Sequence, residues 1–226
     1  LVGLFSIDPY FVRYHLNKRI AYTPDPASLA GNPEQHALRK RLGISSDAIV
    51  ILVYGHIDER KGLQQLVNAV TRIGTDLPIT IFLCGRQKRE SVKFLEGGQG
   101  RNLRVHHRLV ELNRYISPEE EYEAFLAADI VWVCYGNEYS NSSGAMIRAG
   151  QAGRPIITSH YGLTGRMTCD HRVGLSTDAD DTVQIAQAIR RLASDRPLRE
   201  TLGANGLNLF SQHTPEAFVA PIVRHL

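Results

Sequence analysis

The chain has 226 residues, of which 43% are hydrophobic and 22% charged, and 26 Lys+Arg against 23 Asp+Glu leave a formal net charge of +3. This composition excludes general disorder, and so small a charge surplus gives no sign of nucleic-acid or membrane binding. The three cysteines are far apart, which excludes a disulfide scaffold or a Cys-x-x-Cys metal site and suits a reducing compartment. No apolar run approaches the roughly 18 residues of a membrane span, and we expect a cytoplasmic protein.

Short β-branched runs alternate with helical stretches along the chain. Residues 1–26, which include three prolines, predict an extended connecting arm. Apolar runs predict five or six strands, at 48–54, 78–84, 103–106, 129–134, 155–158 and 173–176. One helix is expected at 63–70, and a second, polar one follows the strand 78–84 and ends at about 96. Further helices are expected at 118–127, 143–151, 180–194, 197–209 and 215–225, with a glycine-rich turn at 97–100. This alternation predicts an α/β fold with a Rossmann-like, doubly wound parallel sheet.

The loop after the first expected strand of this sheet combines glycine with two cations. Ligands of such sheets lie beyond the carboxyl ends of the strands, where helix N-termini present free N–H groups. Gly55 directly follows the strand, which lets backbone approach a ligand closely, and Arg60 and Lys61 stand where the next helix begins. This pattern fits an anion site and a solvated helix start equally well.

A run of small polar residues, 135–144, lies between a buried strand and the next helix. Such residues cap a helix, and the N–H groups of Ser143, Gly144 and Ala145 are placed to cradle a diphosphate. Capping accounts for one serine or asparagine, but it does not account for the whole run. The segment therefore indicates a binding loop.

Other nucleotide-binding patterns are missing. No Gly-x-Gly-x-x-Gly follows the first strand, which counts against a dinucleotide oxidoreductase, and no Gly-x4-Gly-Lys-Ser/Thr is present, which excludes a P-loop NTPase. The histidines have no metal-ligand spacing, and the basic run 85–89 is typical of a solvated helix start.

Seven short motifs follow one another in a fixed order, at 20–26, 38–44, 53–63, 83–85, 127–133, 152–157 and 173–175. Together they resemble the C-terminal, nucleotide-sugar-binding domain of GT-B-fold glycosyltransferases of the retaining group 1 class (glycosyltransferase family 4-like). The resemblance implies an interdomain arm over 1–26, a donor-binding Rossmann-like domain over 27–210 and a C-terminal crossover helix over 211–226. It also implies an N-terminal, acceptor-binding domain that this sequence lacks, so we expect no sugar transfer by this fragment alone.

The resemblance further implies transfer of a sugar from a nucleoside-diphosphate sugar, with UDP as the expected nucleotide, to an acceptor hydroxyl in polysaccharide or glycolipid synthesis. It implies no cofactor, no metal, and at most peripheral contact with the inner face of a membrane. Lys61 and Arg60 are the expected catalytic residues, stabilising the leaving diphosphate. The implied binding residues are Gly55, His56, Ser142, Ser143, Gly144 and Ala145 for the diphosphate, Gly85, Arg108, Leu109 and Arg148 for the nucleoside, and Glu138, Ser140 and Asn141 for the sugar.

Two departures from the family pattern stand in this site. The family's arginine before the diphosphate lysine is His56 here, which makes Arg60 the candidate for the second positive charge. The family's Glu-x7-Glu pair falls on Ser140 and Arg148, with Glu138 two residues from the first position. An arginine cannot accept the ribose hydrogen bonds made by the second Glu. Arg148 would instead reach a phosphate oxygen, or it would face outward if the register slips by one residue. A nucleotide-sugar-binding pseudoenzyme and a GT-B nucleotide-sugar epimerase therefore remain as alternatives.

Overall fold

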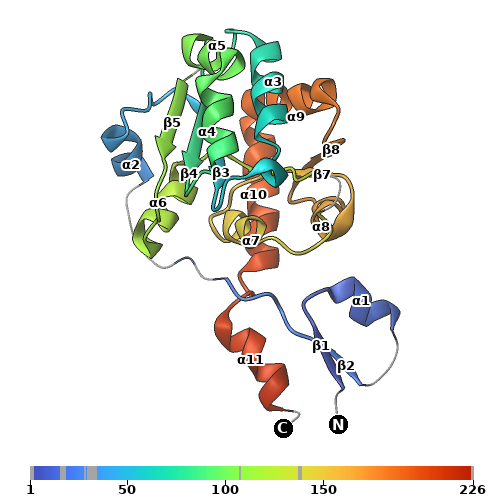
Figure 1. Cartoon of the computed structure of the whole chain (residues 1–226). Helices are drawn as coiled ribbons and strands as arrows, with labels where there is room; N and C mark the ends of the chain where they lie inside the picture. Colours follow the sequence, from blue (N-terminus) through green and yellow to red (C-terminus); the bar gives the residue numbers. More distant parts are fainter. Residues whose placement is uncertain are drawn as a thin grey trace.

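The computed structural model describes residues 3–15, 19–27, 29, 35–106, 108–136 and 139–224. Its centre is a six-stranded parallel sheet, as the alternating pattern predicts, with the strand order β5-β4-β3-β6-β7-β8 (Figure 1). The strands are β3 (Ile49–Tyr54), β4 (Ile79–Cys84), β5 (Arg108–Leu112), β6 (Ile130–Val133), β7 (Ile156–Ser159) and β8 (Gly174–Thr177). Because β3 pairs with both β4 and β6, the strand order reverses at the middle of the sheet.

Helices cover both faces of this sheet. One face carries α3 (Leu63–Ile73), α4 (Arg89–Glu96), α5 (Gly98–His106) and α9 (Thr182–Ser194), and the other carries α2 (Gln35–Arg41), α6 (Pro118–Ala127), α7 (Gly144–Gln151) and α8 (Gly162–His171). Side chains of β3 alternate between the two cores: Ile51 and Val53 pack on the first face, Val50 and Leu52 on the second. All four are fully buried, which explains the unbroken apolar run.

The segment 97–106 differs from its prediction. It forms α5 rather than a turn and a strand, and the edge strand β5 follows at Arg108–Leu112. Gly100 allows α5 to begin directly against the end of α4, because a Cβ at this position would lie 2.1 Å from the Leu95 carbonyl oxygen. Leu103 of α5 is then fully buried in the core. The apolar residues at 103 and 105 alternate like a strand, but tertiary packing makes them helical.

Helix α8 was not predicted, because its sequence has little apolar periodicity. Two glycines let it pack closely against its neighbours. A Cβ on Gly162, whose φ is +69°, would lie 2.8 Å from Ser140 Cα, and one on Gly165 would lie 2.5 Å from the Ser159 carbonyl oxygen. The helix thereby holds the end of the loop that precedes α7.

The N-terminal residues do not form a simple extended arm. They contain a small parallel pair of strands, β1 (Leu4–Ser6) and β2 (Ile20–Tyr22), with the short helix α1 (Pro9–Tyr14) between them. Asp8 caps α1, which explains how a segment with a proline at its first position becomes helical. The extended conformation predicted for residues 1–26 is therefore wrong at Pro9–Tyr14, which is helical.

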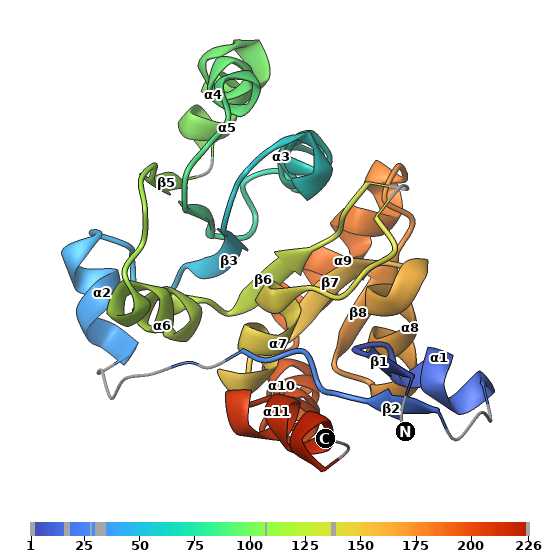
Figure 2. The same ribbon diagram turned by 60° about the horizontal axis from the view of Figure 1, so that its bottom comes forward.

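The residues after β2 connect this unit to the main domain. Figure 2 shows the described part of this segment running past α7. The Gln151 side-chain amide of α7 donates hydrogen bonds to the carbonyls of Ala27 (2.9 Å) and His213 (3.0 Å). His213 lies between α10 (Arg196–Phe210) and α11 (Pro215–Val223), so one side chain ties the connection to the C-terminal turn. Within the described residues, no helix is long and apolar enough to cross a membrane.

Candidate functional site

Two adjoining cavities lie where the carboxyl ends of β3 and β6 meet, at the reversal of strand order. Their volumes are about 820 Å³ and about 270 Å³, and both are lined by Tyr54, Gly55, His56 and Arg148. The reversal point leaves a crevice because the connections from neighbouring strands turn to opposite faces of the sheet. We refer to the two cavities as the larger cavity and the smaller cavity.

Lys61 reaches into the smaller cavity. Its Nζ donates a hydrogen bond to the Tyr135 hydroxyl at 3.2 Å and lies 4.8 Å from the centre of that ring. The Trp132 indole nitrogen donates to the Lys61 carbonyl at 2.7 Å and so fixes the backbone. Burial lowers the pKa of Lys61 to about 8, which leaves the ammonium mostly charged at pH 7. A cation held in this way is suited to an anionic ligand.

Arg60 stands at the rim of the same cavity. Its guanidinium pairs with Asp58 at 2.9 Å, and its side chain is 57% exposed whereas that of Asp58 is 3% exposed. Much of the Arg60 charge is therefore neutralised within the loop. Lys61 is the stronger candidate for direct contact with an anion.

The N-terminus of α7 forms the opposite wall of the smaller cavity. Ser143 caps the helix by accepting a hydrogen bond from the Met146 N–H at 3.3 Å, and its hydroxyl lies 2.7 Å from the Tyr135 hydroxyl. Gly144 and Ala145 also line this wall. The first N–H groups of a helix have no partner within it, and its dipole favours negative charge there. Tyr135 thus connects the lysine to the helix terminus.

Two of the three loop residues predicted to hold the sugar do not line either cavity. Ser140 and Asn141 are exposed and line neither cavity, and Glu138 lies outside the described residues. Ser142, predicted to contact the diphosphate, donates its hydroxyl hydrogen to Asp25 at 2.6 Å and lines neither cavity. Its position in the structure is that of a tie between this loop and the N-terminal connection.

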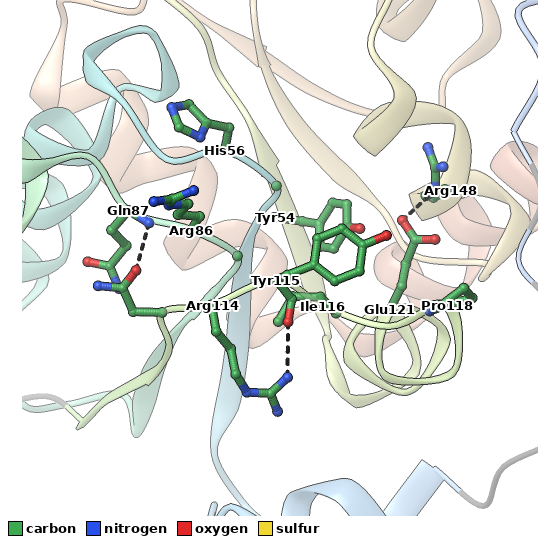
Figure 3. A pocket seen from close by; sticks show the side chains of 13 residues that line it. Tyr54, His56, Arg86, Gln87, Arg114, Tyr115, Ile116, Pro118, Glu121 and Arg148 are labelled. Carbon is green, nitrogen blue, oxygen red and sulfur yellow. Dashed lines mark hydrogen bonds and ion pairs between the residues drawn. The ribbon is translucent and has the colours of Figure 1, made fainter.

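The larger cavity lies beyond the carboxyl ends of β3, β4 and β5 (Figure 3). Gly85, which is predicted to contact the nucleoside, lines this cavity with a φ of +134°, and a Cβ there would lie 2.1 Å from the Gly55 carbonyl oxygen. Arg86, predicted to belong to a solvated helix start, lines it as well. The remaining lining residues are Gln87, Asn113, Arg114, Tyr115, Ile116, Pro118 and Glu121.

The prediction that Arg108 and Leu109 follow a strand at this edge is wrong. They begin β5, paired with Thr80 and Ile81 at the start of β4, so they lie toward the opposite edge of the sheet. The error follows from the misplaced strand at 103–106. The residues that follow β5 are 113–116, and these line the larger cavity.

Arg148 lines both cavities, and its Nε lies 2.6 Å from Oε1 of Glu121 (Figure 3). Glu121 is buried, with 8% of its surface exposed. The sequence pattern did not indicate Glu121, because it ends a run of three glutamates in the first turn of α6 that reads as helix capping. An acidic residue at a position otherwise suited to the buried face of α6 was the only available signal.

The chain matches one protein family along most of its length. The family model of the glycosyl transferases group 1 matches residues 34–209. The chain is 28% identical over 227 residues to the D-inositol 3-phosphate glycosyltransferase of Stackebrandtia nassauensis, covering 95% of this chain and 48% of that protein. The chain thus spans about half the length of this relative.

Two solved structures have the same fold. Sucrose-phosphate synthase from Thermosynechococcus elongatus superposes with a TM-score of 0.77 at 23% identity, covering 98% of this chain and 56% of its own. Anabaena HepE in complex with UDP-glucose superposes with a TM-score of 0.70 at 17% identity, covering 92% and 58%. With the family model spanning most of the main domain, the chain belongs to the group 1 glycosyltransferases and has the Rossmann-like architecture of the C-terminal half of a GT-B fold.

Proposed function

We propose that this chain is the donor-binding half of a retaining glycosyltransferase that uses a nucleoside-diphosphate sugar, with UDP as the nucleotide. The diphosphate occupies the smaller cavity and the nucleoside the larger one. The observation that carries the proposal is a buried lysine facing a helix N-terminus across a cavity of about 270 Å³, which adjoins a larger cavity. HepE, which has the same fold, is in complex with UDP-glucose, and this supports the choice of donor.

The geometry suits departure of a diphosphate. In the proposed reaction the bond from the sugar's anomeric carbon to the diphosphate oxygen breaks, and its electron pair stays on the diphosphate. The acceptor hydroxyl oxygen bonds to the carbon and releases its proton. Lys61 and the first N–H groups of α7 face the oxygens on which the charge develops, and removing one such preorganised donor costs on the order of 3 kcal/mol of transition-state stabilisation.

The names of relatives indicate the class of acceptor. The relatives' names include glycosyltransferases of D-inositol 3-phosphate and of the lipopolysaccharide core. We propose an acceptor hydroxyl in polysaccharide or glycolipid synthesis, bound mainly by protein outside this chain. The second cation expected at the diphosphate is Arg60, whose pairing with Asp58 leaves it at the rim.

Isothermal titration of UDP, UDP-glucose, GDP and UMP against this chain tests donor binding. We expect UDP to bind at least about tenfold more tightly than UMP, because only UDP places a second phosphate in the smaller cavity. Binding of none of the four nucleotides would refute the proposal. With a full-length protein, release of UDP that depends on an acceptor distinguishes a transferase from a pseudoenzyme and from an epimerase.

A further inference from the structure

We propose that Glu121 accepts the hydrogen bonds of the ribose 2′- and 3′-hydroxyls of the bound nucleotide, and that Arg148 is the positioning residue that holds its carboxylate. This assignment rests on the proposed function. It moves the acceptor for the ribose from α7, where the family pattern expects a glutamate, to α6.

The first support is the charge of the cavity walls. Among the described residues that line the two cavities, Glu121 is the sole carboxylate. The other ionisable residues that line the cavities are basic or phenolic. Arginine and lysine side chains donate hydrogen bonds but accept none. If the two ribose hydroxyls donate hydrogen bonds, the carboxylate of Glu121 is the one strong acceptor side chain among the described residues of these walls.

The second support is position. Arg148, which touches Glu121, lines both cavities, so the carboxylate lies beside the wall that they share. In a nucleoside diphosphate the ribose stands between the base and the phosphates. If the diphosphate meets Lys61 and the base lies beyond β4 and β5, the ribose must cross this junction.

The third support is hydrogen-bonding capacity. A carboxylate has about four lone-pair sites. Arg148 Nε forms an ion pair with one oxygen at 2.6 Å, and the Tyr54 hydroxyl hydrogen-bonds to this carboxylate. At least two sites then remain for a vicinal diol. Figure 3 shows the Tyr54 and Glu121 side chains on the same side of the cavity, with Arg148 directed at the carboxylate.

Pairing with Arg148 explains how the Glu121 carboxylate can be buried. Its Nη1 donates to the Gly144 carbonyl at 3.3 Å, so the guanidinium folds back along α7 toward Glu121. An unpaired buried carboxylate is strongly unfavourable, and a paired one is held in a fixed orientation. Arg148 therefore acts on the nucleoside through Glu121, which refines the prediction of a direct nucleoside contact.

The test compares UDP with 2′,3′-dideoxy-UDP by isothermal titration on wild type and Glu121→Gln. We expect wild type to prefer UDP by about tenfold or more and Glu121→Gln to reduce this preference to about threefold or less, because charged acceptors hold a diol more strongly than an amide. Dideoxy-UDP should bind both proteins alike. Glu119→Gln, the same change on the exposed side of α6, should keep the full preference.

Arg148 is tested with the same ratio. Arg148→Met should lose the preference and Arg148→Lys should restore part of it, which a merely structural role would not produce. The preference is a ratio within one protein and does not depend on the folded fraction. If Glu121→Gln does not fold, Glu121→Asp, with its carboxylate withdrawn by one methylene, should show the same loss.

Two results would overturn the assignment while leaving the proposed function intact: an unchanged preference in Glu121→Gln, or an equal loss of affinity for both nucleotides. A wild-type protein that binds neither nucleotide would overturn the proposed function and the assignment together.

Discussion

Replacing Lys61 with methionine should weaken ligand binding and stabilise the unliganded fold at the same time. Methionine keeps an unbranched side chain of similar length and removes the charge. A charge-assisted hydrogen bond contributes about 1.5–3 kcal/mol, so UDP affinity should fall by a factor of about 10 to 150. Opposite signs for binding and stability are the mark of a group placed for a ligand rather than for folding.

The stability term follows from burial of the charge. Lowering a lysine pKa from 10.5 to about 8 corresponds to about 3 kcal/mol against the folded, charged form at pH 7. The variant also loses the hydrogen bond to Tyr135 and the contact with its ring. Their loss costs about 1–2 kcal/mol and cancels part of the gain in stability. Lys61→Met should therefore raise the free energy of unfolding by about 1–2 kcal/mol and Tm by roughly 2–8 °C.

Isothermal titration with UDP and urea unfolding at pH 7 measure the two effects on one preparation. Lys88→Met is the matched control: Lys88 is 42% exposed, pairs with Glu59 at 3.5 Å and lines neither cavity. It should change stability by less than about 0.5 kcal/mol and UDP affinity by less than about twofold. An unaltered UDP affinity in Lys61→Met, or a loss of stability of the size found for a core substitution, would refute this reasoning.

Three further predictions follow from the same contacts. UDP affinity should fall as pH rises through about 8, because the folded pKa of Lys61 is depressed and deprotonation removes the cation, whereas Lys61→Met should show no such step. Gly85→Ala should cost about 2 kcal/mol or more in urea unfolding, because of its φ of +134° and the Gly55 carbonyl oxygen 2.1 Å from the new Cβ; a smaller cost would mean that the loop relaxes freely. Ser142→Ala should cost about 1 kcal/mol of stability and leave UDP affinity unchanged in titration, since its hydroxyl bonds to Asp25, and a tenfold loss of affinity would return Ser142 to the diphosphate site.

The amino-acid sequence by itself determined the fold class and the main residues of the smaller cavity. Strands buried on both faces appear as unbroken apolar runs, as in β3, and the capping box of Ser117 and Glu120 marks the start of α6. Lys61 and Ser143 could be predicted because each lies between the end of a strand and the helix that follows it. Local order in the chain is enough to place such residues at the carboxyl edge of a parallel sheet.

Tertiary structure decided most of the larger cavity. The residues 97–106 carry weak local preferences, and close packing of Gly100 against α4 made them a helix, which moved β5 and brought 113–116 to the larger cavity. Glu121 and Arg148 lie on different helices. Only the packing of α6 and α7 on one face of the sheet brings Arg148 Nε to 2.6 Å from Glu121 Oε1. Pairing between residues distant in sequence depends on how whole elements pack, and no local pattern in a single sequence encodes that distance.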